Sequence, residues 1–132
     1  MKILVIDDER PALRRLTESV QNVAPDAEIY PFSDTDEYFA HEPKTGFDAA
    51  FVDIELGEMS GIELALEIKK HSPLCNIIFV TSYSKYGAEA FSARPSGFIV
   101  KPFTEDELRN ELDNLRYPLS ESKKQEKKIR VS

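Results

Sequence analysis

The sequence has no tryptophan, a single cysteine and only two histidines among its 132 residues. One cysteine excludes an internal disulfide and any multi-cysteine zinc site, and two histidines argue against histidine-rich metal binding. No run of 18 apolar residues occurs, so the sequence predicts no membrane-spanning helix. The short apolar stretch at the N-terminus ends in Asp7-Asp8-Glu9, which does not fit a signal peptide. We therefore expect a cytoplasmic protein without a membrane partner.

Basic residues are scarce over most of the chain, and the net charge is −7. Residues 118–132 hold five Lys or Arg against two acidic residues, whereas residues 1–117 hold twelve against twenty-two, a balance of −10. Such an acidic body repels nucleic-acid phosphates, so we expect that the domain itself does not bind DNA. The change of composition at Pro118 predicts one domain over 1–117, followed by a basic linker or a disordered tail over 118–132.

Five short apolar runs alternate with longer amphipathic stretches. This alternation predicts a doubly wound α/β fold with a five-stranded parallel sheet and right-handed crossovers. The predicted strands are 3–6, 28–32, 49–52, 77–80 and 98–100. The predicted helices are 11–23, a short helix capped by Ser33 or Asp34, a helix from Ser60-Gly61 to before Pro73, a short helix over 85–91, and a last helix that begins with a Thr104–Glu107 capping box.

Polar residues follow the ends of four of these strands. They are Asp7-Asp8-Glu9, Asp53, Thr81-Ser82 and Lys101-Pro102. The carboxyl ends of parallel strands form the active crevice in such sheets, so we expect these side chains to converge on one rim. One acidic residue alone is more often a helix cap. Carboxylates, a hydroxyl and a lysine from four strand ends together favour a functional site.

The chemistry of this group of residues points to a cation and a phosphoryl group. Two carboxylates about 4 Å apart repel each other by about 4 kcal/mol at an effective dielectric near 20, so three in a crevice require a cation. Oxygen ligands favour Mg²⁺ or Mn²⁺ over zinc. A carboxylate beside such an ion, a hydroxyl and an ammonium can act as the nucleophile in phosphoryl transfer. No P-loop is present, so the phosphoryl donor must bring its own leaving group and its own protein.

Four motifs resemble the receiver domain of two-component response regulators over residues 2–117. They are ILVIDDE, FVDIELGEMSGIEL, IIFVTSYS and GFIVKPF, and they stand in the family's order and spacing. The resemblance implies a flavodoxin-like (βα)5 receiver fold with Asp53 as the phosphoacceptor. It also implies that Asp8, Asp53 and the Glu55 backbone carbonyl hold Mg²⁺, and that Asp7 reaches the ion through water. Thr81 and Lys101 would contact the phosphoryl oxygens. The Lys101-Pro102 peptide would be cis, and Phe98 would be the aromatic switch residue.

The resemblance also implies partners and an output. A sensor histidine kinase would donate the phosphoryl group, and the fourth helix and fifth strand would then change and support a homodimer. The chain would not be an enzyme beyond its own phosphoryl transfer and dephosphorylation. The stretch SYSKYGAEAFSARPSGFIVKPF is similar to receivers of the LytTR-type branch, and the final KKIRVS resembles the opening strand of a truncated effector domain. DNA would be bound only through that missing domain; the alternative is a stand-alone receiver that acts by protein–protein interaction.

Two other classes of protein could use similar groups. A Mg²⁺-dependent aspartyl-phosphate hydrolase of the haloacid-dehalogenase-like pattern needs a second Asp two residues after the nucleophile, where this chain has Glu55. A flavodoxin-like nucleotide-binding module needs a Ser, Thr or Gly-rich loop after the first strand, where this chain has the acidic DDERP. Other expectations are solvent-facing His41 and His71, Cys75 as a packing or surface thiol, and Glu58, Tyr83 and Ser84 near the site.

Overall fold

The computed structural model describes residues 1–57, 59–82, 87–117 and 119. Every helix within these ranges is too short or too polar to span a lipid bilayer. The elements are β1 (Lys2–Ile6), α1 (Arg10–Val23), β2 (Glu28–Phe32), α2 (Thr35–Ala40), β3 (Ala49–Val52), β4 (Glu55–Leu56), β5 (Met59–Ser60), α3 (Gly61–His71), β6 (Asn76–Thr81), α4 (Gly87–Ala90), the 3₁₀ helix η2 (Phe91–Ala93), β7 (Gly97–Val100) and α5 (Glu105–Asp113).

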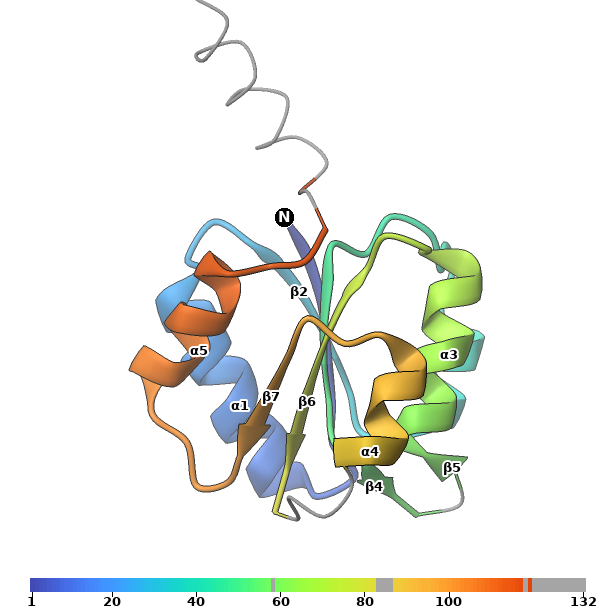
Figure 1. The fold of residues 1–132 in the computed structure, drawn as a ribbon, viewed down its shortest axis with the longest axis horizontal. Coiled ribbons are helices and arrows are strands. Elements are labelled where there is room, and N and C mark those ends of the chain that lie inside the picture. The colour runs from blue at the N-terminus through green and yellow to red at the C-terminus, as the bar shows by residue number, and fades with distance from the viewer. Residues whose placement is uncertain (58, 83–86, 118, 120–132) are drawn as a thin grey trace, which may run out of the picture.

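The main sheet has five strands in the order β2-β1-β3-β6-β7, and every neighbouring pair is parallel. Figure 1 shows the strands running in one direction, with helices on both faces of the sheet. The order reverses direction at β1, because the chain first adds β2 on one side and then β3, β6 and β7 on the other. The doubly wound five-stranded sheet that the sequence predicts is therefore confirmed.

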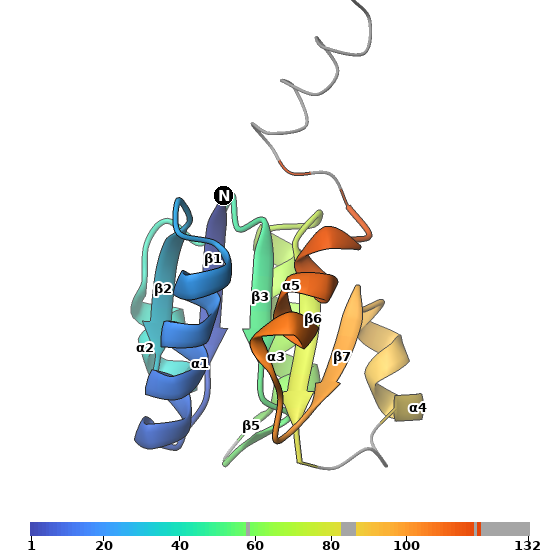
Figure 2. The same cartoon turned by 90° about the vertical axis from the view of Figure 1, so that its left-hand side faces the viewer.

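Each face of the sheet carries its own hydrophobic core, and side chains alternate between the two along every strand. Ile3 and Val5 of β1 belong to the core that contains residues of α1 and α5, whereas Leu4 and Ile6 belong to the core that contains residues of α2, α3 and α4. Figure 2 shows α1 and α5 on one side of the sheet and α2, α3 and α4 on the other. Residues 3–6 are aliphatic without interruption because both faces of β1 are covered.

Side-chain caps fix where three helices begin. Ser60 and Glu63 form a capping box at the start of α3, and Thr104 does so with Glu107 at the start of α5. Asp34, rather than Ser33, caps α2 by accepting the amide of Glu37.

Two local features differ from the expectation. The short antiparallel pair β4–β5 lies between β3 and α3, and two-residue strands are too short to give a periodic sequence signal. The helix expected over 85–91 is described as α4 over Gly87–Ala90, followed by η2; residues 85 and 86 lie outside the described part of the chain. Arg94 ends η2 with a positive φ of 47°.

The expectation that His41 faces solvent is wrong. Its ring lies edge-on to Tyr30 and Phe32, with centroids 5.2 and 5.4 Å away, and its Nε2 is buried. Phe47 completes the set of three aromatic residues around His41, because β2 and the segment before β3 meet beside α2. His71 is exposed, as expected. Cys75 is fully buried, and this burial raises the pKa of its thiol to about 12, so the thiol is a packing group rather than a nucleophile.

Candidate functional site

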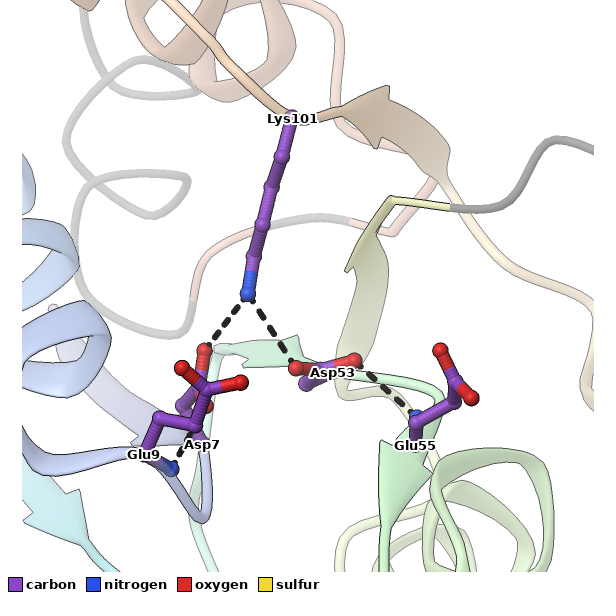
Figure 3. Close-up of polar contacts among 5 residues, drawn as sticks. All are labelled: Asp7, Glu9, Asp53, Glu55 and Lys101. Atoms are coloured by element: carbon purple, nitrogen blue, oxygen red, sulfur yellow. Dashed lines mark hydrogen bonds and ion pairs between the residues drawn. The ribbon is translucent and has the colours of Figure 1, made fainter.

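Residues from three strand ends meet at the carboxyl edge of the sheet. Asp7 follows β1, Asp53 follows β3 and Lys101 follows β7. The Lys101 Nζ lies 2.8 Å from Asp7 Oδ2 and 3.1 Å from Asp53 Oδ2 (Figure 3). One ammonium therefore joins two carboxylates that are 46 residues apart in the sequence, and this contact is the centre of the candidate site.

Three carboxylates converge at this point. Asp7, Asp8 and Asp53 each offer one oxygen, and these oxygens lie within 4.8 Å of one another. Asp7 and Asp53 are buried, whereas Asp8 is exposed and faces the solvent side of the cluster. An oxygen-only set that is open on one side suits a hard divalent cation that keeps part of its hydration shell. The cluster is therefore a candidate divalent-metal site.

The two buried carboxylates are held in the same way by their own backbones. Asp7 Oδ1 accepts the amide of Glu9 at 3.0 Å, and Asp53 Oδ1 accepts the amide of Glu55 at 3.0 Å (Figure 3). Each is an Asx-type turn, in which a carboxylate binds the backbone two residues later. One oxygen of each aspartate is thus fixed to its own loop, and the other is turned toward Lys101.

Burial dominates the electrostatics of Asp53. Loss of hydration raises the pKa of Asp53 to about 6, although the Glu55 amide and the Lys101 charge oppose the rise and only the Asp7 charge adds to it. Burial alone would lower the pKa of Lys101, but its contacts with Asp7 and Asp53 outweigh this effect and raise it. The Lys101 ammonium therefore stays protonated at neutral pH. The negative charge of Asp53 is destabilised by burial more than the Lys101 charge and the Glu55 amide stabilise it.

Thr81 and Phe98 lie on the same face of neighbouring strands. Thr81 is the buried last residue of β6 and pairs with Val100, two residues after Phe98 on β7. Phe98 pairs with Phe79, and their ring centroids are 6.0 Å apart. The Lys101 amide donates to the Thr81 carbonyl at 2.9 Å. The Thr81 backbone is thereby joined to the loop that carries Lys101.

Sequence reasoning missed the role of Gly61 in placing Asp53. A Cβ on Gly61 would lie 2.0 Å from the Asp53 carbonyl oxygen, so only glycine lets the first residue of α3 pack against the Asp53 peptide. The Gly61 amide also donates to the Ile54 carbonyl at 2.6 Å. The sequence signal for this role was a glycine directly after the Ser60 cap. Glycine lowers the stability of a helix, so its presence there indicates a close backbone contact.

The other predicted site residues are placed as follows. The backbone amide of Glu55 donates to the Asp53 carboxylate. A ligand role for the Glu55 carbonyl stays a prediction. The peptide between Lys101 and Pro102 is cis. Glu58, Tyr83 and Ser84 lie outside the described residues.

Next to Lys101 is a cavity of about 230 Å³, lined by Ala12, Arg15, Ser82, Lys101, Pro102 and Phe103.

Comparison with known proteins agrees with this geometry. Residues 3–113 match the response regulator receiver domain family. The chain belongs to this family. It is 32% identical over 131 residues to the sensory transduction protein LytR of Staphylococcus epidermidis. This match covers 98% of this chain and 51% of that protein. It is 35% identical over 114 residues to the transcriptional regulatory protein NatR of Bacillus subtilis, covering 86% of this chain and 48% of NatR. The chain thus spans about half the length of these relatives.

Solved structures show the same fold. The response regulator TrrA of Thermotoga maritima, in complex with Mg²⁺ and beryllium fluoride, is 32% identical with a TM-score of 0.73; the match covers 85% of this chain and 96% of TrrA. The response regulatory domain of mrkE from Klebsiella pneumoniae is 28% identical with a TM-score of 0.74, covering 87% of this chain and 94% of that domain. The chain is therefore a receiver domain in fold and in family.

Proposed function

We propose that this receiver domain accepts a phosphoryl group on Asp53 in a Mg²⁺-dependent reaction. Receiver domains interact with histidine kinases, and we propose a sensor histidine kinase as the donor. The observation that carries the proposal is the Lys101 ammonium, which touches both Asp7 and Asp53 at the mouth of the acidic cluster. It provides a fixed positive charge where a phosphoryl group on Asp53 would place its oxygens.

The reaction follows from the residues in place. An Asp53 carboxylate oxygen attacks phosphorus, a P–O bond forms, the P–N bond to the donor imidazole breaks, and that imidazole leaves with the bonding electron pair. Mg²⁺ bound by Asp8, Asp53 and the Glu55 carbonyl, with Asp7 reaching it through water, would neutralise the charge on the transferring group. Lys101 would pair with the phosphoryl oxygens, and the Glu55 amide keeps the Asp53 side chain oriented.

The chain would be a substrate of its kinase rather than an enzyme, apart from its self-catalysed transfer and dephosphorylation. Because named relatives such as NatR are transcriptional regulators about twice as long as the match, we propose that residues 1–117 act as the receiver of such a regulator. Residues 118–132 would then be a basic linker or the start of an effector domain, and DNA would be bound only by that domain.

A small phosphodonor distinguishes this function from its two rivals. With acetyl phosphate and Mg²⁺, we expect the intact mass of the chain to rise by about 80 Da, the mass of one phosphoryl group on a carboxylate. Rapid turnover of acetyl phosphate without an adduct would favour the hydrolase instead, and an unchanged mass without turnover would favour a nucleotide-binding module.

Thr81 is proposed to couple phosphorylation to association. Its hydroxyl would donate to a phosphoryl oxygen after the β6 end moves inward, and the Phe98 ring would occupy the space left behind. The changed surface, around 86–91 and 94–98, would support a homodimer or another protein contact; residue 86 lies outside the described part of the chain.

Thr81→Ala is therefore expected to leave phosphorylation of Asp53 largely intact while abolishing the increase in association. Sedimentation with the beryllofluoride mimic and mass-detected phosphorylation on the same sample measure both effects. Thr45→Ala is the matched control, because it removes a threonine hydroxyl from an exposed loop before β3. Undiminished association of Thr81→Ala on activation would contradict the coupling.

A further inference from the structure

A buried asparagine lies at the other end of the sheet from Asp53 and uses its whole side-chain amide. Asn76, the first residue of β6, is fully buried. Its Nδ2 donates to the Asp48 carbonyl at 2.9 Å and to the Tyr117 carbonyl at 3.0 Å. Its Oδ1 accepts the Ser96 hydroxyl at 2.6 Å and the Tyr117 amide at 2.6 Å. Two donors and two acceptors satisfy this amide completely.

These bonds fix the segment that follows α5. The Asn76 amide binds both the N–H and the carbonyl of Tyr117, as a neighbouring strand would. The Arg116 amide donates to the Ser96 hydroxyl at 3.0 Å. Figure 1 shows this segment at the end of the sheet where the chain begins, opposite the carboxyl ends of the strands. The last backbone groups before residue 118 are therefore bound by side chains of β6 and of the turn before β7.

A lysine makes a second link between the same two regions. The Lys69 Nζ of α3 lies 3.3 Å from the Tyr117 hydroxyl and 3.4 Å from the Ala93 carbonyl at the end of η2. The same ammonium lies 4.7 Å from the centroid of the Tyr117 ring. Both links thus connect residues 116–117 to Ala93 at the end of η2 and to Ser96 in the η2–β7 turn, residues 94–96.

We propose that Asn76, Ser96 and Lys69 form a clamp that fixes the Arg116–Tyr117 segment after α5 and ties this segment to the η2–β7 turn. This turn leads into β7, where Phe98 is the second residue, so a change of the α4–β7 surface would reach residues 116–117 through Ser96 and Lys69. The link to activation rests on the proposed function; the clamp itself does not. Its role would be to report the state of the receiver to whatever the chain carries beyond residue 117.

Amide hydrogen exchange on the full chain tests the clamp. Ser96→Ala removes the acceptor of the Arg116 amide and one donor to Asn76, so we expect the Arg116 and Tyr117 amides to exchange about tenfold faster. Ser92→Ala is the matched control, because the Ser92 hydroxyl is exposed and binds only the Glu89 carbonyl among the contacts that the structure describes. Equal exchange at Arg116 and Tyr117 in both variants would overturn the clamp.

A second variant tests the Lys69 link. If Lys69 couples the two regions, its removal should affect both of them. Lys69→Met keeps the alkyl chain but removes the ammonium from Tyr117 and Ala93. We expect faster exchange of the Arg94 and Ser96 amides, which bind the Phe91 and Ile77 carbonyls, and of the Tyr117 amide. Lys70→Met removes a neighbouring exposed ammonium that pairs with Glu67 and should change none of them. A local effect confined to α3 in Lys69→Met would contradict the link.

Activation with Mg²⁺ and beryllofluoride separates the clamp from the proposed function. If the mimic binds, we expect the Tyr117 amide exchange rate to change by about threefold or more in the parent and in Ser92→Ala, but not in Ser96→Ala. Binding at Asp53 without any change at Tyr117 in the parent would overturn the link to activation. Failure of the mimic to perturb the Asp53 region would instead contradict the proposed function, while the exchange differences among the metal-free variants would still decide the clamp.

Discussion

Asp53→Asn is expected to stabilise the metal-free protein by about 2–3 kcal/mol at about pH 7.5. The reason is the burial of Asp53, which raises its pKa from 3.8 to about 6 in spite of the nearby Lys101. Asparagine has nearly the same shape and carries no charge, and Lys101 keeps its contact with Asp7. Denaturant unfolding in the presence of a chelator measures the difference.

The same pKa predicts how stability depends on pH. Native Asp53 binds its proton more tightly than the unfolded chain does, so the native state holds more protons between about pH 4 and pH 6. The free energy of unfolding should therefore fall as the pH rises through this window and remain lower above it. Asp53→Asn should lack this contribution, so the gain in stability over the parent should appear only above about pH 4 and reach its full size above about pH 6.

Asp26→Asn is the matched control, because Asp26 is an exposed aspartate in the connection between α1 and β2, at the opposite edge of the sheet. It should leave the free energy of unfolding unchanged within about 0.5 kcal/mol. If Asp53→Asn instead destabilised the metal-free protein, the attraction of Lys101 would outweigh the burial of Asp53, and the electrostatic account of the cluster would be wrong.

Mg²⁺ in the millimolar range is expected to raise the stability of the unphosphorylated protein. Ligand that binds only the folded state stabilises it by mass action, by about 1.4 kcal/mol at a tenfold excess over the dissociation constant. For a domain of this size, that corresponds to a rise of a few degrees in Tm. The gain arises because the cation relieves the repulsion among Asp7, Asp8 and Asp53.

Asp8→Asn should weaken this gain strongly, since Asp8 contributes one of the three clustered oxygens. Glu9→Gln is the matched control: it removes the same charge from an exposed neighbour that is not part of the cluster. Thermal unfolding with and without Mg²⁺ compares the variants. A parent whose Tm ignores Mg²⁺, or equal responses of Asp8→Asn and Glu9→Gln, would contradict the metal site.

The parts of the molecule that the sequence predicts well are those with a strong local signal. The uninterrupted aliphatic residues 3–6 predict a strand covered on both faces, and both cores contain them. Asp53 and Lys101 could be expected to meet because both follow strands of a parallel sheet, for which the winding rule brings the carboxyl ends to one edge. The structure confirms that Asp53 and Lys101 meet at this edge and are in contact.

Features that depend on contacts distant in the sequence could not be predicted in this way. The fully bonded side chain of Asn76 depends on Tyr117, 41 residues later, and neither residue carries a motif. His41 is half-buried because Tyr30 and Phe47 meet there in the fold. The β4–β5 pair is too short for periodicity to indicate it. Each of these is a tertiary effect that overrides a weak local preference.

The most direct test of the central claim is the intact mass of the parent and of Asp53→Asn after treatment with acetyl phosphate and Mg²⁺. The parent should gain one adduct of about 80 Da, because one carboxylate acts as the nucleophile beside Lys101. Asp53→Asn should gain none, and Asp26→Asn should be labelled like the parent. An adduct of undiminished yield on Asp53→Asn would show that the phosphoryl group is carried elsewhere, and it would contradict the assignment of Asp53 as the phosphoacceptor.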